Sequence, residues 1–267
     1  MTRRLFVLLL WVLQVGPVGP VSVGACSREP DAPTRTPIRV AAASSLSSAF
    51  EVLGRDFERT TGHPVVFSFG STGLLAKQLR EGAPFDVFAS ADVATVDALV
   101  SASVCDGATK TNYARGRLAL WSRVDKGPPP TTLVDLTDER FVHIAIANPE
   151  HAPYGQAAQQ ALQSVGLWDR LKPRLVYGEN IRQALQFAQT GNAEVALVAL
   201  SLVVDDHQNP FTLVDESLHR PLDQALVVCG RGTNEGGLAF ARFVASEAGR
   251  AVLRRHGYSF PLPADAK

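Results

Sequence analysis

From residue 38 onward, short apolar runs alternate with stretches whose apolar residues recur at helical spacing. The run at 38–43 is typical of a strand that is buried on both faces of a sheet. The period then changes, and one helical stripe is formed by Leu46, Ala49, Phe50, Leu53 and Phe57. Two further apolar runs, at 64–69 and 86–89, are followed by helical patterns at 74–81 and 93–100. This order of strands and helices predicts a parallel sheet with helices on both faces.

The same alternation returns in the second half of the chain. Strands are predicted at 117–121, 141–147, 175–177, 195–199 and 225–229, and helices at 157–165, 181–189, 238–246 and 249–255. The segment 126–132 contains Gly127 and three prolines, which is typical of a surface loop. We therefore predict an α/β fold of two lobes with a cleft between them.

The first 25 residues have the pattern of an export signal. Arg3 and Arg4 precede an apolar stretch at 5–15 that is too short to span a bilayer as a helix. At its end, the sequence VGAC at 23–26 resembles the lipobox of bacterial lipoproteins. This resemblance implies cleavage after residue 25 and lipid attachment to Cys26. An ordinary cleavage site is the alternative, and the paired arginines leave both the general and the twin-arginine export routes open. Residues 26–37 carry three prolines and predict a flexible tether, so we expect an exported, periplasmic protein that is anchored to a membrane.

Charge and cysteine content add two constraints. The chain has 26 basic and 26 acidic residues, and removal of residues 1–25 would take away two arginines alone, which leaves 24 against 26 and a net charge of −2. This excludes the broad positive surface of a nucleic-acid-binding protein. Three cysteines cannot form a disulfide framework. With Cys26 lipidated, Cys105 and Cys229 remain either as a disulfide in an oxidising compartment or as two separate buried residues.

Motifs for enzymatic chemistry are missing from the sequence. There is no G-x-S-x-G, H-E-x-x-H, C-x-x-C or P-loop motif. After Gly230 and Gly232 the next glycine, Gly236, comes one position too late for a dinucleotide fingerprint. The six histidines are scattered without the spacing of metal ligands. We therefore expect a binding protein rather than an enzyme, with no cofactor and no directly bound metal.

Four strand-to-helix junctions share one chemistry. They are Ser44-Ser45, Ser71-Thr72-Gly73, Tyr154-Gly155 and Asn180-Ile181. Each would place unpaired backbone N–H groups at a helix start, where the helix dipole favours an anion, and such junctions lie at the ligand-binding edge of a parallel sheet. None contains Lys or Arg, and the one nearby carboxylate, Glu179, is expected on the rim. Donors without acceptors suit a fully deprotonated oxyanion, whereas a protonated phosphate would also need an acceptor.

At these junctions the sequence resembles the molybdate-binding proteins of bacterial ABC importers. The resemblance covers about residues 38–260 and rests on the motifs AAASSL at 41–46, GSTG at 70–73, GAPFDVFASAD at 82–92, NPEHAPYG at 148–155 and ENIRQAL at 179–185. The third and fourth motifs are long, so the combination is specific.

The resemblance implies the two-lobed periplasmic-binding-protein fold of type II, with mixed, mostly parallel sheets and two chain crossovers. One lobe would comprise 38–114 and 224–267, and the other 115–223. The ligand would be molybdate or tungstate, and a monomeric protein would deliver it to a permease in the inner membrane.

The resemblance also implies a set of ligand contacts. These fall on Ser44, Ser45, Thr72, Tyr154 and, through its backbone N–H, Ile181, with Ala91 and Asn180 as further candidates. Part of the family has a ligand-binding tyrosine where this chain has Ala199, and a small residue where this chain has Tyr154. We interpret this exchange as compensation by a phenol that approaches from another junction.

Three alternatives remain open from the sequence. The cleft could bind another oxyanion, such as sulfate or phosphate, or the protein could be an oxyanion-sensing module that signals to a receptor. An enzyme resembling the tetrapyrrole-building deaminases would share the two-lobed scaffold. It would need a cofactor cysteine, for which Cys229 is the only candidate, and a cleft lined by arginines.

Overall fold

The computed structural model describes residues 35–230 and 234–260, which belong to one compact unit. The predicted export signal, Cys26 and the tether up to residue 34 lie outside the described residues. Within the described part of the chain, no helix combines the length and the apolar character needed to cross a bilayer.

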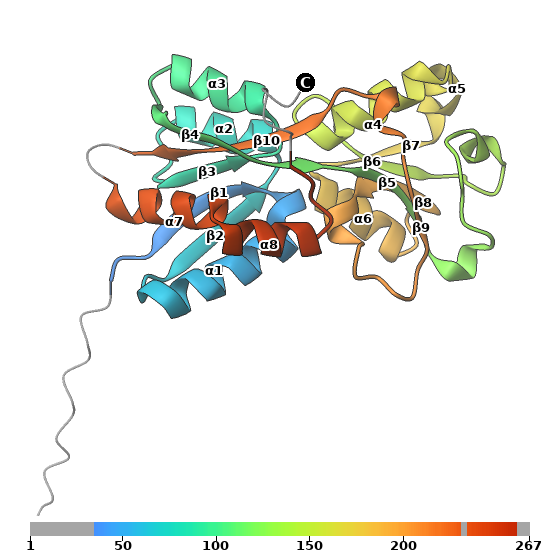
Figure 1. Ribbon diagram of the computed structural model, residues 1–267. Coiled ribbons are helices and arrows are strands. Elements are labelled where there is room, and N and C mark those ends of the chain that lie inside the picture. The colour runs from blue at the N-terminus through green and yellow to red at the C-terminus, as the bar shows by residue number, and fades with distance from the viewer. Residues whose placement is uncertain (1–34, 231–233, 261–267) are drawn as a thin grey trace, which may run out of the picture. The chain divides into compact units, whose positions relative to one another are not determined.

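Strands and helices alternate along the described residues (Figure 1). The strands are β1 (Ile38–Ala43), β2 (Val65–Gly70), β3 (Val87–Ser90), β4 (Cys105–Gly116), β5 (Leu118–Ser122), β6 (Ile144–Ala147), β7 (Leu175–Gly178), β8 (Val195–Ala199), β9 (Phe211–Leu213) and β10 (Leu222–Cys229). The α-helices are α1 (Ser47–Thr61), α2 (Thr72–Arg80), α3 (Val93–Ser101), α4 (Pro153–Ser164), α5 (Trp168–Leu171), α6 (Ile181–Gln189), α7 (Glu235–Ala245) and α8 (Glu247–Arg255). Short 3-10 helices are η1 (Ser44–Leu46), η2 (Val124–Lys126), η3 (Val134–Thr137), η4 (Lys172–Arg174), η5 (Leu200–Leu202) and η6 (Glu216–Leu218).

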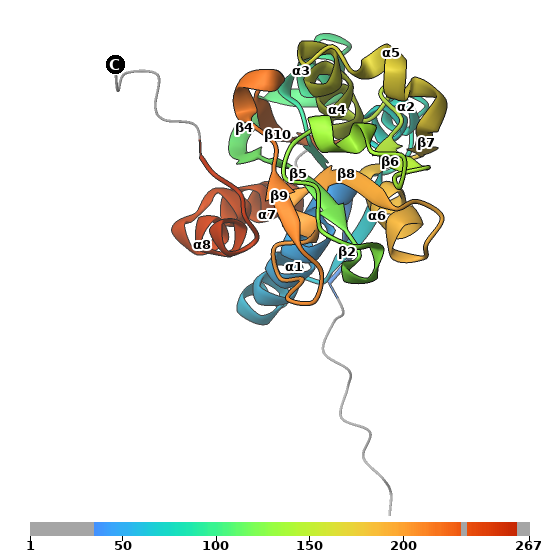
Figure 2. The same cartoon turned by 90° about the vertical axis from the view of Figure 1, so that its right-hand side faces the viewer.

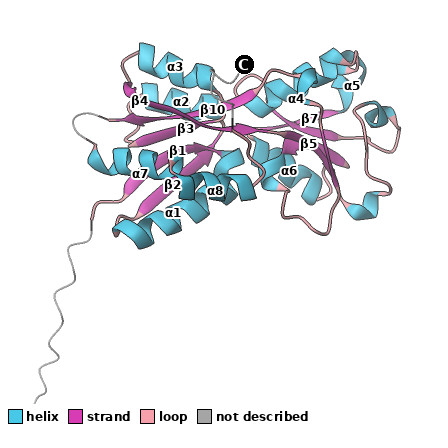
Figure 3. Cartoon of the chain, in the orientation of Figure 1, coloured by secondary structure: helices cyan, strands magenta, loops and turns pink. Residues whose placement is uncertain are grey.

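The strands form two five-stranded sheets, and each sheet with its helices is called a lobe below (Figure 3). The first has the order β2-β1-β3-β10-β4 and the second β7-β6-β8-β5-β9. In the first sheet, β1 pairs in parallel with β2 and β3, and β10 pairs antiparallel with β3 and β4. In the second, β6 pairs in parallel with β7 and β8, and β5 pairs antiparallel with β8 and β9. The predicted two-lobed fold with mixed sheets is confirmed. The expectation of mostly parallel sheets is wrong, because parallel and antiparallel pairings are equally common among the described strands: β5 and β10 each run antiparallel to both neighbours.

Helices cover both faces of the first sheet, as the alternating pattern predicts. Leu75 and Leu79 of α2 and Leu99 of α3 pack against Phe88 of β3 in one apolar cluster. The helices α1, α7 and α8 cover the opposite face (Figure 1). In the second lobe, α4 and α6 lie against the sheet on either side of β6 and β8 (Figure 2). Burying apolar surface on both faces accounts for the nearly continuous apolar runs of the central strands.

Two neighbouring strands of the first sheet, β4 and β10, carry the chain between the lobes. Gly116 at the end of β4 pairs with Leu222 at the start of β10, and Arg117 alone separates β4 from β5. Next to this crossover, the Arg115 guanidinium bonds both carboxylate oxygens of Asp223, at 2.5 and 3.0 Å. The crossovers therefore run side by side as one hydrogen-bonded ribbon.

A disulfide between Cys105 and Cys229 joins the far end of this ribbon, where the two residues are paired across β4 and β10. Of the two possibilities left open by the sequence, the structure contains the bonded pair. The sulfur of Cys229 is therefore not free to hold a cofactor, which removes the cysteine that a deaminase-like enzyme would need.

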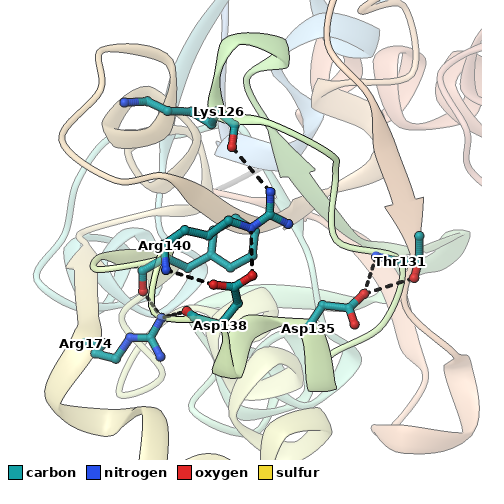
Figure 4. A network of polar contacts seen from close by, with 7 residues as sticks. Lys126, Thr131, Asp135, Asp138, Arg140 and Arg174 are labelled. Atoms are coloured by element: carbon teal, nitrogen blue, oxygen red, sulfur yellow. Dashed lines mark hydrogen bonds and ion pairs between the residues drawn. The ribbon is translucent and has the colours of Figure 1, made fainter.

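The predicted loop at 126–132 belongs to a longer connection between β5 and β6, which a polar network holds together (Figure 4). The Thr131 N–H and hydroxyl donate to the Asp135 carboxylate at 2.8 and 2.9 Å, and the N–H bonds from this turn hold the pKa of Asp135 below its ordinary value. Arg140 pairs with Asp138 at 3.2 Å, and Arg174 donates to the Asp138 carbonyl at 2.7 Å. This segment therefore belongs to the second lobe and takes no part in the crossover.

Candidate functional site

A small cavity lies between the two lobes, at the carboxyl ends of β1 and β2 and beside the first turns of α2, α4 and α6. The lining residues are Ala43, Ser44, Ser45, Gly70, Ser71, Thr72, Ala91, Ala152, Pro153, Tyr154 and Ile181. Of the residues that the sequence suggested as ligand contacts, all but Asn180 line this cavity. The junctions that seemed equivalent in the sequence converge on one site.

Ser45 places a buried hydroxyl at the cavity. Its side chain is buried, and its Oγ makes no hydrogen bond of good geometry with any described residue. The Ser45 backbone is held firmly, because its carbonyl accepts bonds from the Ser201 hydroxyl at 2.7 Å and the Tyr258 hydroxyl at 2.8 Å. A buried polar atom without a partner is costly. Because this hydroxyl lines the cavity, it is available to a polar ligand there.

Thr72 is the first residue of α2, and its hydroxyl is oriented by the neighbouring strand. The Ala91 N–H donates to Thr72 Oγ1 at 3.2 Å. The bond occupies one acceptor position of the hydroxyl oxygen and leaves its proton free to be donated elsewhere. The backbone N–H of Ala91, which the sequence suggested as a possible direct contact, is thus engaged by Thr72 in this structure.

Tyr154 places a phenol in the cavity from the second lobe. Pro153 begins α4 with its fixed backbone angle, and Tyr154 follows in the first turn. The Gln224 amide donates to the phenol oxygen at 3.3 Å. Burial, and after it the neighbouring Tyr258, raise the pKa of Tyr154 well above its ordinary value, against the smaller opposing effects of Gln224 and the nearby Ser45 hydroxyl. The phenol therefore remains protonated at neutral pH and can act as a hydrogen-bond donor.

The phenol reaches this position because Gly116 has no side chain. A Cβ atom built at Gly116 would lie 2.0 Å from the Tyr154 hydroxyl oxygen and 2.8 Å from Gln224 Nε2. Any other residue would collide with the phenol, so this glycine is required by a close approach rather than by an unusual backbone angle. Sequence reasoning missed both Gly116 and Gln224, although a glutamine within the apolar strand β10 was a visible signal.

Ile181 and Asn180 have different roles at the start of α6. The Asn180 carboxamide caps the helix by accepting bonds from the N–H groups of Arg182 and Gln183, both at 3.1 Å. Ile181 lines the cavity, and its N–H is the first of this turn and is not a donor to the cap. Asn180 thus orders the helix start, whereas Ile181 faces the site.

The cavity is electrically neutral. No charged side chain is among the lining residues described above. Glu179 lies in a separate groove that it shares with Lys77 and Glu81, which agrees with its expected place on the rim. In the described part of the chain, no group of three His, Cys, Asp or Glu side chains could hold a metal ion directly. The site therefore offers hydroxyl protons and helix starts, and no formal charge.

The two lobes also contact each other directly beside the cavity. The Ser71 hydroxyl lies 2.5 Å from the carbonyl oxygen of His151 and 2.8 Å from its Nδ1. The Gly73 N–H donates to the same carbonyl at 2.9 Å. The start of α2 is thus bonded to the loop before α4, and the structure has its lobes closed over the site.

Comparison with known proteins gives a consistent result. The sequence matches the model of the family described as bacterial extracellular solute-binding proteins over residues 38–259. It is 35% identical to the molybdate-binding protein ModA of Rhodobacter capsulatus, over 82% of this chain and 86% of that protein. It is 36% identical to ModA of Azotobacter vinelandii, over 83% and 89% of the two chains. The solved structure of the Azotobacter vinelandii periplasmic molybdate-binding protein superposes with a TM-score of 0.79 at 29% identity, over 84% of this chain and 100% of that one. The matched range includes both sheets and every residue that lines the cavity.

Proposed function

Since this chain belongs to the bacterial extracellular solute-binding proteins, we propose that its interlobe cavity captures molybdate or tungstate for delivery to a membrane permease. The family consists of binding proteins, so the expectation of a binding protein rather than an enzyme is confirmed. The family is extracellular, and the protein accordingly works outside the cytoplasm.

The observation that carries the proposal is that three hydroxyl groups in the cavity keep a proton to donate. The oxygen of Thr72 accepts from Ala91, and that of Tyr154 accepts from Gln224, so each keeps its proton for another acceptor. The Ser45 hydroxyl has no well-formed bond among the described residues. Together with the N–H of Ile181, these groups would surround an anion with donors from both lobes.

The same donors favour a fully deprotonated oxyanion over a protonated one. A protonated phosphate would need an acceptor for its own proton, and no carboxylate lines the described cavity. Sulfate is fully deprotonated but smaller than molybdate, so a rigid ring of donors discriminates against it by size. The similarity to the molybdate-binding proteins of Rhodobacter capsulatus and Azotobacter vinelandii supports molybdate. Molybdate and tungstate are nearly equal in size and charge, and we propose that both bind.

Closure of the lobes is the proposed mechanism. An anion that bridges Ser45 and Thr72 of the first lobe and Tyr154 of the second contacts both lobes only when they are closed. It therefore shifts the population toward the closed form. The permease would recognise the closed form and accept the ion, and no bond of the ligand would be made or broken.

Calorimetry with molybdate, tungstate, sulfate and phosphate tests the proposal on the mature protein. We expect tight binding of the first two alone. Tyr154→Phe and Thr72→Ala should each weaken binding about 10-fold or more, because a hydrogen bond to a charged group contributes about 1.5–3 kcal/mol. Tyr177→Phe, which alters an exposed tyrosine of β7, is the matched control and should bind like the unaltered protein. Tight binding of phosphate with no response to molybdate would overturn the proposal.

We further propose that Cys26 carries a lipid anchor and that a tether at 26–37 connects it to the described residues. The motif VGAC at 23–26 supports this. Metabolic labelling with palmitate should mark the unaltered protein and not Cys26→Ser. An unlabelled wild-type protein would refute the anchor.

A further inference from the structure

The Tyr154 phenol is the end of a buried chain of polar groups that starts outside the cavity. The Tyr113 hydroxyl lies 3.1 Å from the Ser90 carbonyl oxygen and 3.0 Å from Gln224 Oε1. Gln224 Nε2 lies 3.3 Å from the Tyr154 oxygen. The Gln224 side chain is fully buried, on a strand whose other described side chains are mostly apolar. A polar side chain in such a place needs its bonds to be satisfied, so each of its contacts matters.

The direction of the Gln224 amide decides where the Tyr154 proton can go. In the observed orientation the carboxamide oxygen faces Tyr113 and the nitrogen faces Tyr154. The nitrogen can only donate, so the phenol oxygen accepts from it and the phenol proton remains available. In the opposite orientation the carboxamide oxygen would accept a hydrogen bond from the phenol. Only the observed orientation leaves Tyr154 as a donor toward the cavity.

We propose that Gln224 is a positioning residue, which donates to the Tyr154 oxygen and thereby directs the phenol proton to the bound anion. This inference rests on the proposed function, because it deepens the role of a residue in the same site. Gly116 completes the arrangement from β4, where the missing side chain admits the phenol oxygen. The two strands that carry the chain between the lobes, β4 and β10, thus both contribute a residue next to the phenol oxygen.

A double-mutant cycle in molybdate affinity separates this role from a general effect on packing. Gln224→Met keeps the length of the side chain and removes its donor, and we expect binding to weaken about 10-fold. In the Tyr154→Phe background the same change should cause no further loss, because the proton that Gln224 directs is gone. Equal losses in both backgrounds would overturn the positioning role and leave the proposed function intact. If molybdate binds but Tyr154→Phe has no effect, the place of Tyr154 in the site and this inference both fail.

Gln224→Glu provides a second variant, in which the hydrogen-bond donor next to the phenol is replaced by an acceptor. An ionised carboxylate can only accept hydrogen bonds, so the phenol would donate to it instead of to the anion. The carboxylate would also add a negative charge near the anion. We expect a larger loss than for Gln224→Met, with partial recovery as the pH is lowered and the carboxyl group becomes protonated. Wild-type affinity of this variant at neutral pH would overturn the inference.

A stability measurement tests the placement of the phenol without any ligand. Gly116→Ala should lower the melting temperature, since its Cβ would lie 2.0 Å from the Tyr154 oxygen. Adding Tyr154→Phe removes that oxygen; Gln224 Nε2 at 2.8 Å and the ring atom Cζ at 3.0 Å remain close, so the relief should be partial. We expect the double variant to melt above Gly116→Ala alone. If it does not, the phenol does not lie against Gly116 and the arrangement is wrong.

Discussion

Replacing Ser45 by alanine should affect folding and binding in opposite directions. Its buried hydroxyl has no well-formed bond among the described residues, and an unsatisfied buried group costs about 1–3 kcal/mol. Ser45→Ala removes that cost, so the unliganded variant should be as stable as the unaltered protein or about 1 kcal/mol more stable. The variant also loses a donor to the anion, so its affinity should fall about 10-fold or more.

Urea unfolding with and without molybdate measures both effects in one assay. At a ligand concentration of about 1,000 times the wild-type Kd, binding should raise the unfolding free energy of the unaltered protein by about 4.1 kcal/mol. For a variant with 10-fold weaker affinity, the same concentration should give about 2.7 kcal/mol. The difference between the two increments is the lost hydrogen bond, independent of any change in the unliganded fold.

Ser122→Ala is the matched control for this measurement. Ser122 also has a buried hydroxyl without a partner among the described residues, but it lies at the end of β5 and does not line the cavity. Its variant should show the full ligand increment. The reasoning would be refuted if Ser45→Ala were clearly less stable without ligand, or if its ligand increment equalled that of the unaltered protein.

Three further predictions concern closure, the disulfide and pH. Gly73→Ala should speed molybdate release in stopped-flow measurements, because its Cβ would lie 2.9 Å from the His151 carbonyl oxygen and hinder closure; unchanged release would contradict this. Changing Cys105 and Cys229 together to serine should lower the urea-unfolding free energy by up to about 5 kcal/mol, because the disulfide closes a loop of 124 residues. Molybdate affinity should stay unchanged, and a loss of affinity in the folded variant would contradict this expectation. Burial raises the pKa of Tyr258 to about 12. Its contribution to the free energy of unfolding should therefore be complete below about pH 10 and disappear as the pH rises through 12. In Tyr258→Phe, the unfolding free energy should decline less steeply at alkaline pH.

The pattern of apolar residues was sufficient for the elements at the centre of each sheet. The predicted strands at 38–43 and 195–199 coincide with β1 and β8, and the predicted helix at 181–189 coincides with α6. These elements are buried on a defined face, so burial imposes a period on their sequences. The edge strand β4 was not identified, because it pairs with β10 alone and most of its residues are polar and at least partly exposed. The predicted strand at 141–147 begins too early, because the buried Phe141 belongs to the preceding loop.

The candidate site was predictable where it depends on local chemistry. Ser45, Thr72 and Ile181 lie at helix starts that the sequence marks by itself, and the structure brings them to one cavity. The partners of Tyr154 were not predictable, because Gln224 lies 70 residues further along the chain and only the return of β10 to the first sheet brings it to the phenol. Helix starts follow from short-range rules, whereas such pairings follow from the topology.

The paired crossover strands restrict how the lobes can move. A ladder of hydrogen bonds joins β4 to β10, and the Arg115–Asp223 ion pair holds them next to the crossover. Sliding one strand past the other would break many bonds at once, whereas bending or twisting the pair breaks few. Opening of the lobes is therefore expected to be a hinge motion about this strand pair, with few degrees of freedom. Under the proposed function, a permease that responds to this single angle would distinguish the loaded from the empty protein without touching the ion.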